Sequence, residues 1–114
     1  PPPLAEARKY YKVAEGGVAN ELVPDKVLEA KQALVMAEKA YDDDDESFDA
    51  ESLAYIATRK SKLAIAEGGR ASAEKKMRAI DDEYVETQGA LLKEARTAAR
   101  LNKARLEQQS RELA

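Results

Sequence analysis

The densest cluster of side chains with chemical capability is an acidic run from Asp42 to Glu46. Asp42, Asp44 and Glu46 match the first three ligand positions of a calcium-binding loop. The rest of that loop does not match, because Ser47 stands in place of the turn glycine and Leu53 in place of the bidentate glutamate. The pattern therefore predicts a solvated acidic turn and no metal site.

A second candidate is a set of basic side chains on one face of a predicted helix: Lys93, Arg96, Arg100 and Lys103. Nucleic-acid binding usually combines a stronger basic excess with aromatic side chains that stack on bases. Residues 90–114 have a net charge of only +3 and no aromatic residue. We therefore expect these basic groups to solvate the helix, to pair along it with Glu94 or Glu107, or to contact acidic groups of a partner. No nucleic-acid partner is predicted.

The chain contains no histidine and no cysteine, so it lacks the usual general base near neutral pH and any thiolate ligand. Carboxylates are plentiful, but acid–base catalysis needs two of them in a closed pocket with their pKa values pushed apart. No glycine-rich phosphate loop or nucleophile elbow occurs. We predict no enzyme activity, no cofactor, and no catalytic, cofactor-binding or metal-binding residues.

The composition indicates long helices with narrow packing surfaces. Charged residues make up 36% of the chain and aromatic residues 5%, a mixture typical of coiled coils. The net charge of −3 is uneven, since residues 1–58 carry −7. This asymmetry can favour staggered or antiparallel association, or it can reflect solvated faces alone. The longest uncharged apolar run, residues 33–37, is far below the roughly 20 residues that span a bilayer.

Three helices are expected from apolar residues that alternate three and four positions apart. The first covers about residues 4–17 with a seam of Leu4, Ala7, Tyr11, Ala14 and Val18. Gly16-Gly17 can end it in a left-handed conformation, and residues 18–23 form a connection. Pro24 and Asp25 suit the start of a second helix. Its seam is Val27, Ala30, Leu34, Ala37 and Tyr41, widened by Leu28 and Val35.

The third helix begins near residue 48 and continues without proline to Leu113, about 100 Å at 1.5 Å per residue. Ser47 or Asp49 can cap it, and Phe48 is placed to cover the end of the bundle. The inward face of its first part is predicted to be Leu53, Ile56, Ala57, Leu63 and Ala64. Its second part continues with a weaker seam that changes phase near Leu91. The predicted interaction seam there is Met77, Ile80, Tyr84, Leu91, Ala95 and Leu106.

The Gly68-Gly69 pair needs an explanation, because each glycine inside a helix costs roughly 1 kcal/mol relative to alanine. One interpretation is a close approach between backbones, with Ala66-Glu67-Gly68-Gly69 beside the matching Ala14-Glu15-Gly16-Gly17. The other is a simple break that divides the third helix in two.

The run from Gly17 to Ala30, the alanines that follow it, and the segment from Ser47 to Ala54 resemble an uncharacterised Ala-rich helical domain of bacterial envelope lipoproteins. In that family the domain follows a lipoprotein signal and is often followed by a peptidoglycan-binding domain similar to that of outer membrane protein A. The resemblance covers about residues 5–110. It implies a periplasmic, outer-membrane-associated location, with attachment to lipid and cell wall through parts outside this sequence. It supplies no functional residues.

We therefore expect an all-α fold, an antiparallel three-helix bundle over residues 1–69 whose C-terminal helix, residues 70–114, projects as a coiled-coil-like extension of the same domain. The expected function is a non-catalytic spacer or docking module linking outer membrane and cell wall. The expected partner is another protein or a second copy, bound through the C-terminal helix. The alternative is a soluble adaptor that binds a peptide or protein in a groove between helices.

Overall fold

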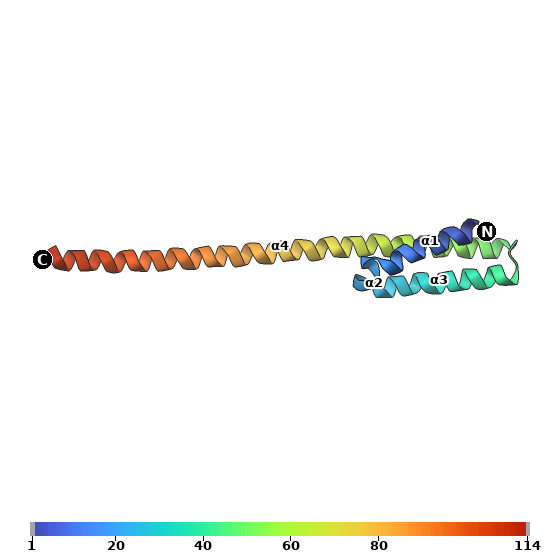
Figure 1. Cartoon of the computed structure of the whole chain (residues 1–114), viewed down its shortest axis with the longest axis horizontal. Helices are drawn as coiled ribbons and strands as arrows, with labels where there is room; N and C mark the ends of the chain where they lie inside the picture. The colour runs from blue at the N-terminus through green and yellow to red at the C-terminus, as the bar shows by residue number, and fades with distance from the viewer. Residues whose placement is uncertain (1, 114) are drawn as a thin grey trace. The chain divides into compact units, whose positions relative to one another are not determined.

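The computed structural model describes residues 2–113, and these are helical except for short connections (Figure 1). The helices are α1 (Pro2–Gly16), α2 (Val18–Leu22), α3 (Pro24–Asp43) and α4 (Phe48–Leu113). The described residues contain no strand, so the all-α prediction is confirmed. None of these helices is both long and apolar enough to cross a membrane. The chain divides into two compact units, and the boundary between Lys75 and Lys76 falls inside α4.

The predicted helix starts are confirmed by their capping residues. Pro24 occupies the first turn of α3, where its missing N–H costs nothing, and Asp25 follows it. At the start of α4 the Ala50 N–H donates a hydrogen bond of 3.2 Å to Ser47 Oγ, which satisfies one of the free donors of the first turn. Of the two predicted caps, Ser47 is therefore the one that acts.

The connection predicted for residues 18–23 contains a short helix, α2, which the sequence analysis missed. Gly17 precedes it in an extended conformation (φ −105°, ψ −171°), so α1 does not end in the predicted left-handed glycine. The seam predicted for α1 also ends differently, because Val18 is 45% exposed and Ala19 is buried in its place. The turn of α2 thus brings Ala19 into the core.

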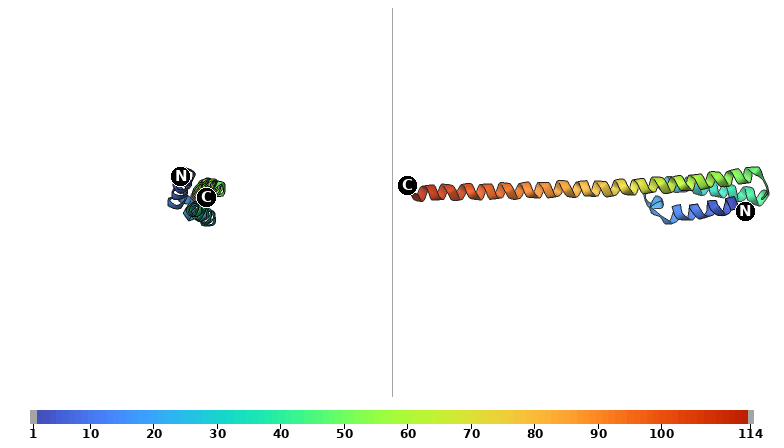
Figure 2. Two further views of the ribbon diagram at one scale, coloured as in Figure 1. Left: turned by 90° about the vertical axis from the view of Figure 1, so that its right-hand side faces the viewer. Right: turned by 90° about the horizontal axis from the view of Figure 1, so that it is seen from above.

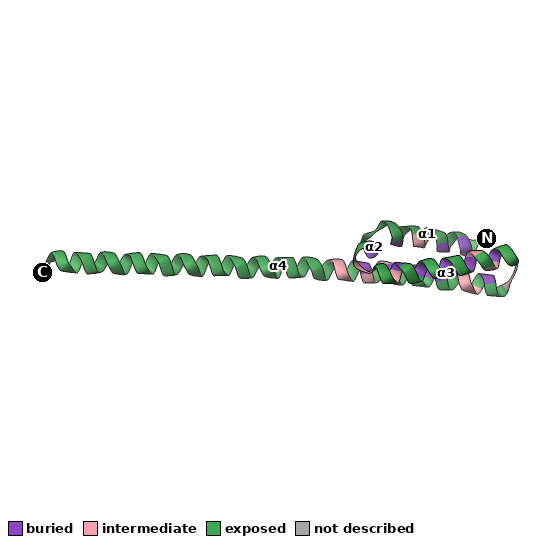
Figure 3. Cartoon of the chain, turned by 90° about the horizontal axis from the view of Figure 1, so that it is seen from below, coloured by how far each residue is buried: buried purple, intermediate pink, exposed green. Residues whose placement is uncertain are grey.

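The core of the first unit is built mainly from alanine. One buried cluster joins Leu4 and Ala7 of α1 to residues of α3 and to Ala50, Ala54 and Ala57 of α4. A second cluster joins Ala14, Ala19, Val27 and Ala64. Figure 2 shows α1, α3 and the first part of α4 around a common centre, and Figure 3 marks the buried residues along these helices. Within this unit α3 runs opposite to α1 and to α4 (Figure 1).

The buried face of α4 matches the predicted one only in part, since Ala57 and Ala64 are buried as expected and the rest of the face differs. Its buried residues repeat at alternating spacings of four and three and are all small: Ala50, Ala54, Ala57, Ser61, Ala64 and Gly68. Thr58 is buried beside them. Small side chains let helix axes approach closely, so that each of these side chains is buried over its whole surface. We refer to these six residues as the small-residue seam.

Of the large apolar residues that were predicted to face inward, Leu53 is half-buried and packs against the core, whereas the other two are exposed. Ile56 and Leu63 are 44% and 51% exposed, on the opposite side of α4 from the small-residue seam. On α3, Leu28 and Val35 do not widen the buried stripe, since both are more than half exposed. Phe48 does not cover the end of the bundle, since it is 81% exposed. The predicted seam of α3 itself, from Val27 to Tyr41, is confirmed as buried.

Gly68 lies against α2, and α4 continues through Gly68-Gly69 without a break. A Cβ atom at Gly68 would lie 2.6 Å from the Cα of Ala19, a distance that real contacts do not reach. The same addition at Gly69 would meet nothing within 4 Å. The close-approach interpretation is therefore correct for Gly68, although its neighbour is Ala19 of α2 rather than the predicted Gly16-Gly17 segment.

Two tyrosines of the first unit have raised pKa values. Burial is the main cause of the raised pKa of Tyr41, and the nearby Glu51 and Tyr55 add to it. Burial also raises the pKa of Tyr11, whose hydroxyl donates a hydrogen bond of 2.8 Å to Glu15 Oε2. In both cases the folded chain favours the neutral hydroxyl.

We expect the Tyr41→Phe variant to lose less stability than the parent chain at alkaline pH. A folded pKa above the unfolded value of about 10 gives a contribution that is present below pH ~10 and is lost as the pH rises through the folded pKa. Phenylalanine cannot ionise, so the stability of the variant does not fall through ionisation at position 41. Urea midpoints measured from neutral pH to about pH 11 check it. If the urea midpoints of the two proteins fall equally between neutral pH and about pH 11, the prediction is wrong.

Candidate interaction surface

Residues 76–113 form one uninterrupted stretch of α4 in which every side chain is exposed (Figure 3). The exposed set includes large apolar residues that a helix would be expected to bury: Met77, Ile80, Tyr84, Val85, Leu91, Leu92, Leu101, Leu106 and Leu113. Scattered single apolar residues on a surface need no explanation, but a regular line of them along one helix is typical of an interaction surface.

Four of the six residues of the predicted interaction seam lie on one stripe of this helix, and Ala95 and Leu106 lie beside it. Successive residues differ by about 100° around the axis, so positions three and four apart share a face. The first stripe is Met77, Ile80, Tyr84, Leu91, Ala98 and Leu101. The second stripe lies about a quarter turn away. It contains Leu92, Ala95, Ala99, Leu106 and Leu113.

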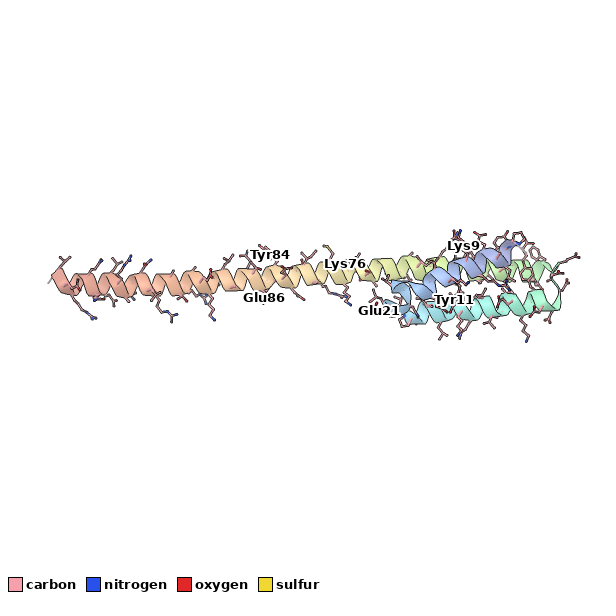
Figure 4. All side chains as sticks on the ribbon, in the orientation of Figure 1. Lys9, Tyr11, Glu21, Lys76, Tyr84 and Glu86 are labelled. Atoms are coloured by element: carbon pink, nitrogen blue, oxygen red, sulfur yellow. The ribbon has the colours of Figure 1, made fainter. Side chains whose placement is uncertain are left out.

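The first stripe is the more regular one, and we call it the outer stripe. The large apolar residues of this stripe are 54–67% exposed. Tyr84, a member of the stripe, lies on one side of the helix, and the charged Glu86 lies on the other (Figure 4). Thr87 and Glu94 occupy the two remaining positions of the three-four repeat between Met77 and Leu101.

The basic side chains at Lys93, Arg96 and Arg100 lie along one shallow depression with Gly89, Leu92 and Thr97. The predicted pairs with Glu94 and Glu107 are not formed, because no ion pair of 4 Å or less joins side chains within residues 76–113. The basic groups are therefore free to contact solvent or an acidic partner.

The acidic run lies at the connection between α3 and α4, as predicted. The Glu46 N–H donates a hydrogen bond of 3.0 Å to Asp44 Oδ1, so one carboxylate is used to hold the turn. Within residues 2–113 no three acidic, histidine or cysteine side chains gather as metal ligands would. The side chains of residues 42–46 are all exposed.

The first unit carries one further apolar surface that the sequence analysis missed. Ile56 and Leu63 line an open depression of about 610 Å³ on α4, together with Arg59, Lys60 and Lys62. Lys62 extends from it to α1, where its Nζ lies 4.6 Å from the centre of the Tyr10 ring. The seven-residue spacing of Ile56 and Leu63 was visible in the sequence, but it was assigned to the core.

A groove between helices exists where α1, α2 and α3 meet. It has a volume of about 300 Å³ and is lined by residues that include Tyr11, Asn20, Val27 and Leu28. Ligand sites are typically enclosed clefts of about 300–1,000 Å³, so this groove lies at the small end of that range.

The chain was compared with protein families, curated proteins and solved structures. A family described as a domain of unknown function (DUF4398) matches residues 2–80. No curated protein and no solved structure matches the chain. The match ends four residues before Tyr84, so most of the outer stripe lies beyond it.

Proposed function

The chain belongs to the DUF4398 family, and on that premise we propose that it is a non-catalytic spacer or docking module of a cell-envelope protein. The observation that carries the docking role is the run of exposed apolar residues on α4 from Met77 to Leu101. The side-chain interactions of the first unit include the helix cap at Ser47 and a surface ion pair between Arg8 of α1 and Glu38 of α3. A mechanical and binding role requires no more than this.

For the architecture we propose an antiparallel three-helix bundle formed by α1, α3 and the first part of α4. Residues 76–113 then serve as a coiled-coil-like extension of the same helix. The small-residue seam and the alanines of α1 and α3 support the bundle, because each is buried against the others. The three-four repeat of the outer stripe supports the extension.

The proposed location is the periplasm, between the outer membrane and the cell wall. Its support is the resemblance of residues 17–54 to the helical domain of envelope lipoproteins. The proposed partner is a protein that covers the outer stripe. The groove of about 300 Å³ at α1, α2 and α3 supports the alternative adaptor role less well, because it is small and open.

Fractionation of cells that produce the full-length gene product with an epitope tag tests the proposed location. We expect the tagged protein in the outer-membrane fraction and accessible to protease after the outer membrane is permeabilised. A cytoplasmic marker and a known periplasmic protein serve as controls. Recovery with the cytoplasmic marker would exclude the envelope role and favour the adaptor.

A further inference from the structure

The apolar side chains of the outer stripe are exposed, so burial of an apolar face does not stabilise this part of α4. Isolated helices owe little stability to propensity and depend on packing of an amphipathic face. Residues 76–113 have no such packing, and Gly89 weakens the helix further without any close neighbour that would require it. A second helix packed on the outer stripe would bury its apolar side chains and stabilise this part of α4.

The spacing of the outer stripe is that of a coiled-coil seam. Met77, Tyr84, Leu91 and Ala98 are seven residues apart, and Ile80, Thr87, Glu94 and Leu101 form a second set at the same spacing. These are the alternating a and d positions of a heptad repeat. A slight left-handed supercoil keeps such a seam on one side over several turns.

Glu94 favours antiparallel over parallel pairing between two copies of this helix. In a parallel pair each seam residue faces its own copy, so two Glu94 carboxylates would meet inside the interface. In an antiparallel pair a positions face d positions, and Glu94 then meets Tyr84 of the second copy. The tyrosine hydroxyl can donate a hydrogen bond to this carboxylate.

The same antiparallel register matches the other layers by size. Met77 faces Leu101 of the second copy, Ile80 faces Ala98, and Leu91 faces Thr87. Each of these four layers occurs twice, so eight layers cover residues 77–101. In the layers of Ile80 and Leu91 a large side chain thus meets a smaller one, as packing without voids favours, and the two large side chains of Met77 and Leu101 meet at the ends of the interface.

Charge favours the same direction. Residues 76–89 carry 2 basic and 4 acidic side chains, for a net charge of −2. Residues 90–113 carry 6 basic and 3 acidic side chains, for a net charge of +3. An antiparallel pair places the acidic half of each helix beside the basic half of the other, whereas a parallel pair opposes like charges.

We propose that residues 77–101 pair with the same segment of a second copy as an antiparallel coiled coil centred on residue 89. The pairing deepens the proposed docking function, since it names the occupant of the outer stripe. It does not depend on the envelope location.

Single-cysteine variants test the register, because the parent chain has no cysteine. At the centre of the antiparallel pair, Ala90 lies beside Ala90 of the second copy. The two Ala98 residues are then 18 residues apart along the axis, or about 27 Å. With a short thiol-specific bis-maleimide we expect cross-linked dimers from Ala90→Cys and none from Ala98→Cys. Both positions are exposed alanines, so each variant is the matched control of the other.

The opposite result, with dimers from Ala98→Cys alone, would show that the two helices pair in parallel and would overturn the antiparallel pairing. Cross-linking of neither variant, together with a monomer in sedimentation equilibrium at hundreds of micromolar, would overturn self-association. Equal cross-linking of both would mean that contacts are non-specific and would also overturn the register. A monomeric result would leave the envelope location intact, since cell fractionation tests that separately.

Discussion

Alanine at position 68 is expected to leave the chain less stable than alanine at position 69 by about 1–3 kcal/mol, the usual cost of overpacking. Both replacements gain about the same helix propensity, roughly 1 kcal/mol over glycine. Their difference therefore isolates the contact with Ala19. At Gly68 the new Cβ would lie 2.8 Å from the Ala19 Cβ and 2.9 Å from its backbone N, so α2 must move. At Gly69 the new methyl group meets open space.

Urea unfolding followed by tyrosine fluorescence measures this difference. Four of the five tyrosines lie before Lys75, so the signal reports on the first unit. The Gly69→Ala variant should be more stable than the parent chain, and Gly68→Ala should be the less stable of the two variants. If the two variants unfold at the same urea concentration, α2 does not lie against α4 at this point.

Enlarging one alanine of the small-residue seam is expected to cost more than truncating a leucine on the other side of α4. Ala57 is fully buried against α1 and α3, so Ala57→Leu inserts side-chain volume where there is none to spare. We expect a loss of about 1–3 kcal/mol in the free energy of unfolding. Leu63 is 51% exposed, and Leu63→Ala is expected to change the free energy by no more than about 0.5 kcal/mol.

The same urea experiment compares the two variants. A burial rule based on side-chain size predicts the reverse order, with Leu63→Ala the more damaging change, because truncating a buried leucine typically costs about 2–5 kcal/mol. That reverse order would place Leu63 in the core, as was predicted from the sequence, and would contradict its exposed position on α4. The two outcomes differ in sign, so the comparison does not depend on the absolute values.

The positions and ends of the helices were largely predictable from local signals. Pro24 and Ser47 mark helix starts because of their own chemistry, and the run from Asp42 to Glu46 opposes continuation of α3. The lack of proline after Ser47 predicted one long helix, although Gly68-Gly69 left a break as the alternative that only the structure excluded. The missed helix α2 has only five residues, which is too short for periodicity to appear.

The candidate site was predictable in part. The residues from Met77 to Leu91 were chosen from their spacing and lie on one stripe. Ala95 and Leu106 were joined to them, but they fall outside the a and d positions of the heptad repeat that these residues define. The exposed pair Ile56 and Leu63 was missed because large apolar residues were assumed to face the core.

The sequence by itself determined that this chain is helical, where its helices begin, and which faces carry a heptad repeat. These depend on backbone propensity, capping and spacing, all of which act within a few residues. Only the tertiary structure decided which face of α4 is buried, because two stripes of that helix have the required spacing. The stripe of alanine, serine and glycine lies inside, since helices rich in alanine pack at short distances that leucine and isoleucine would prevent. The contact of Gly68 with Ala19 follows from that choice and joins residues that are far apart in the chain.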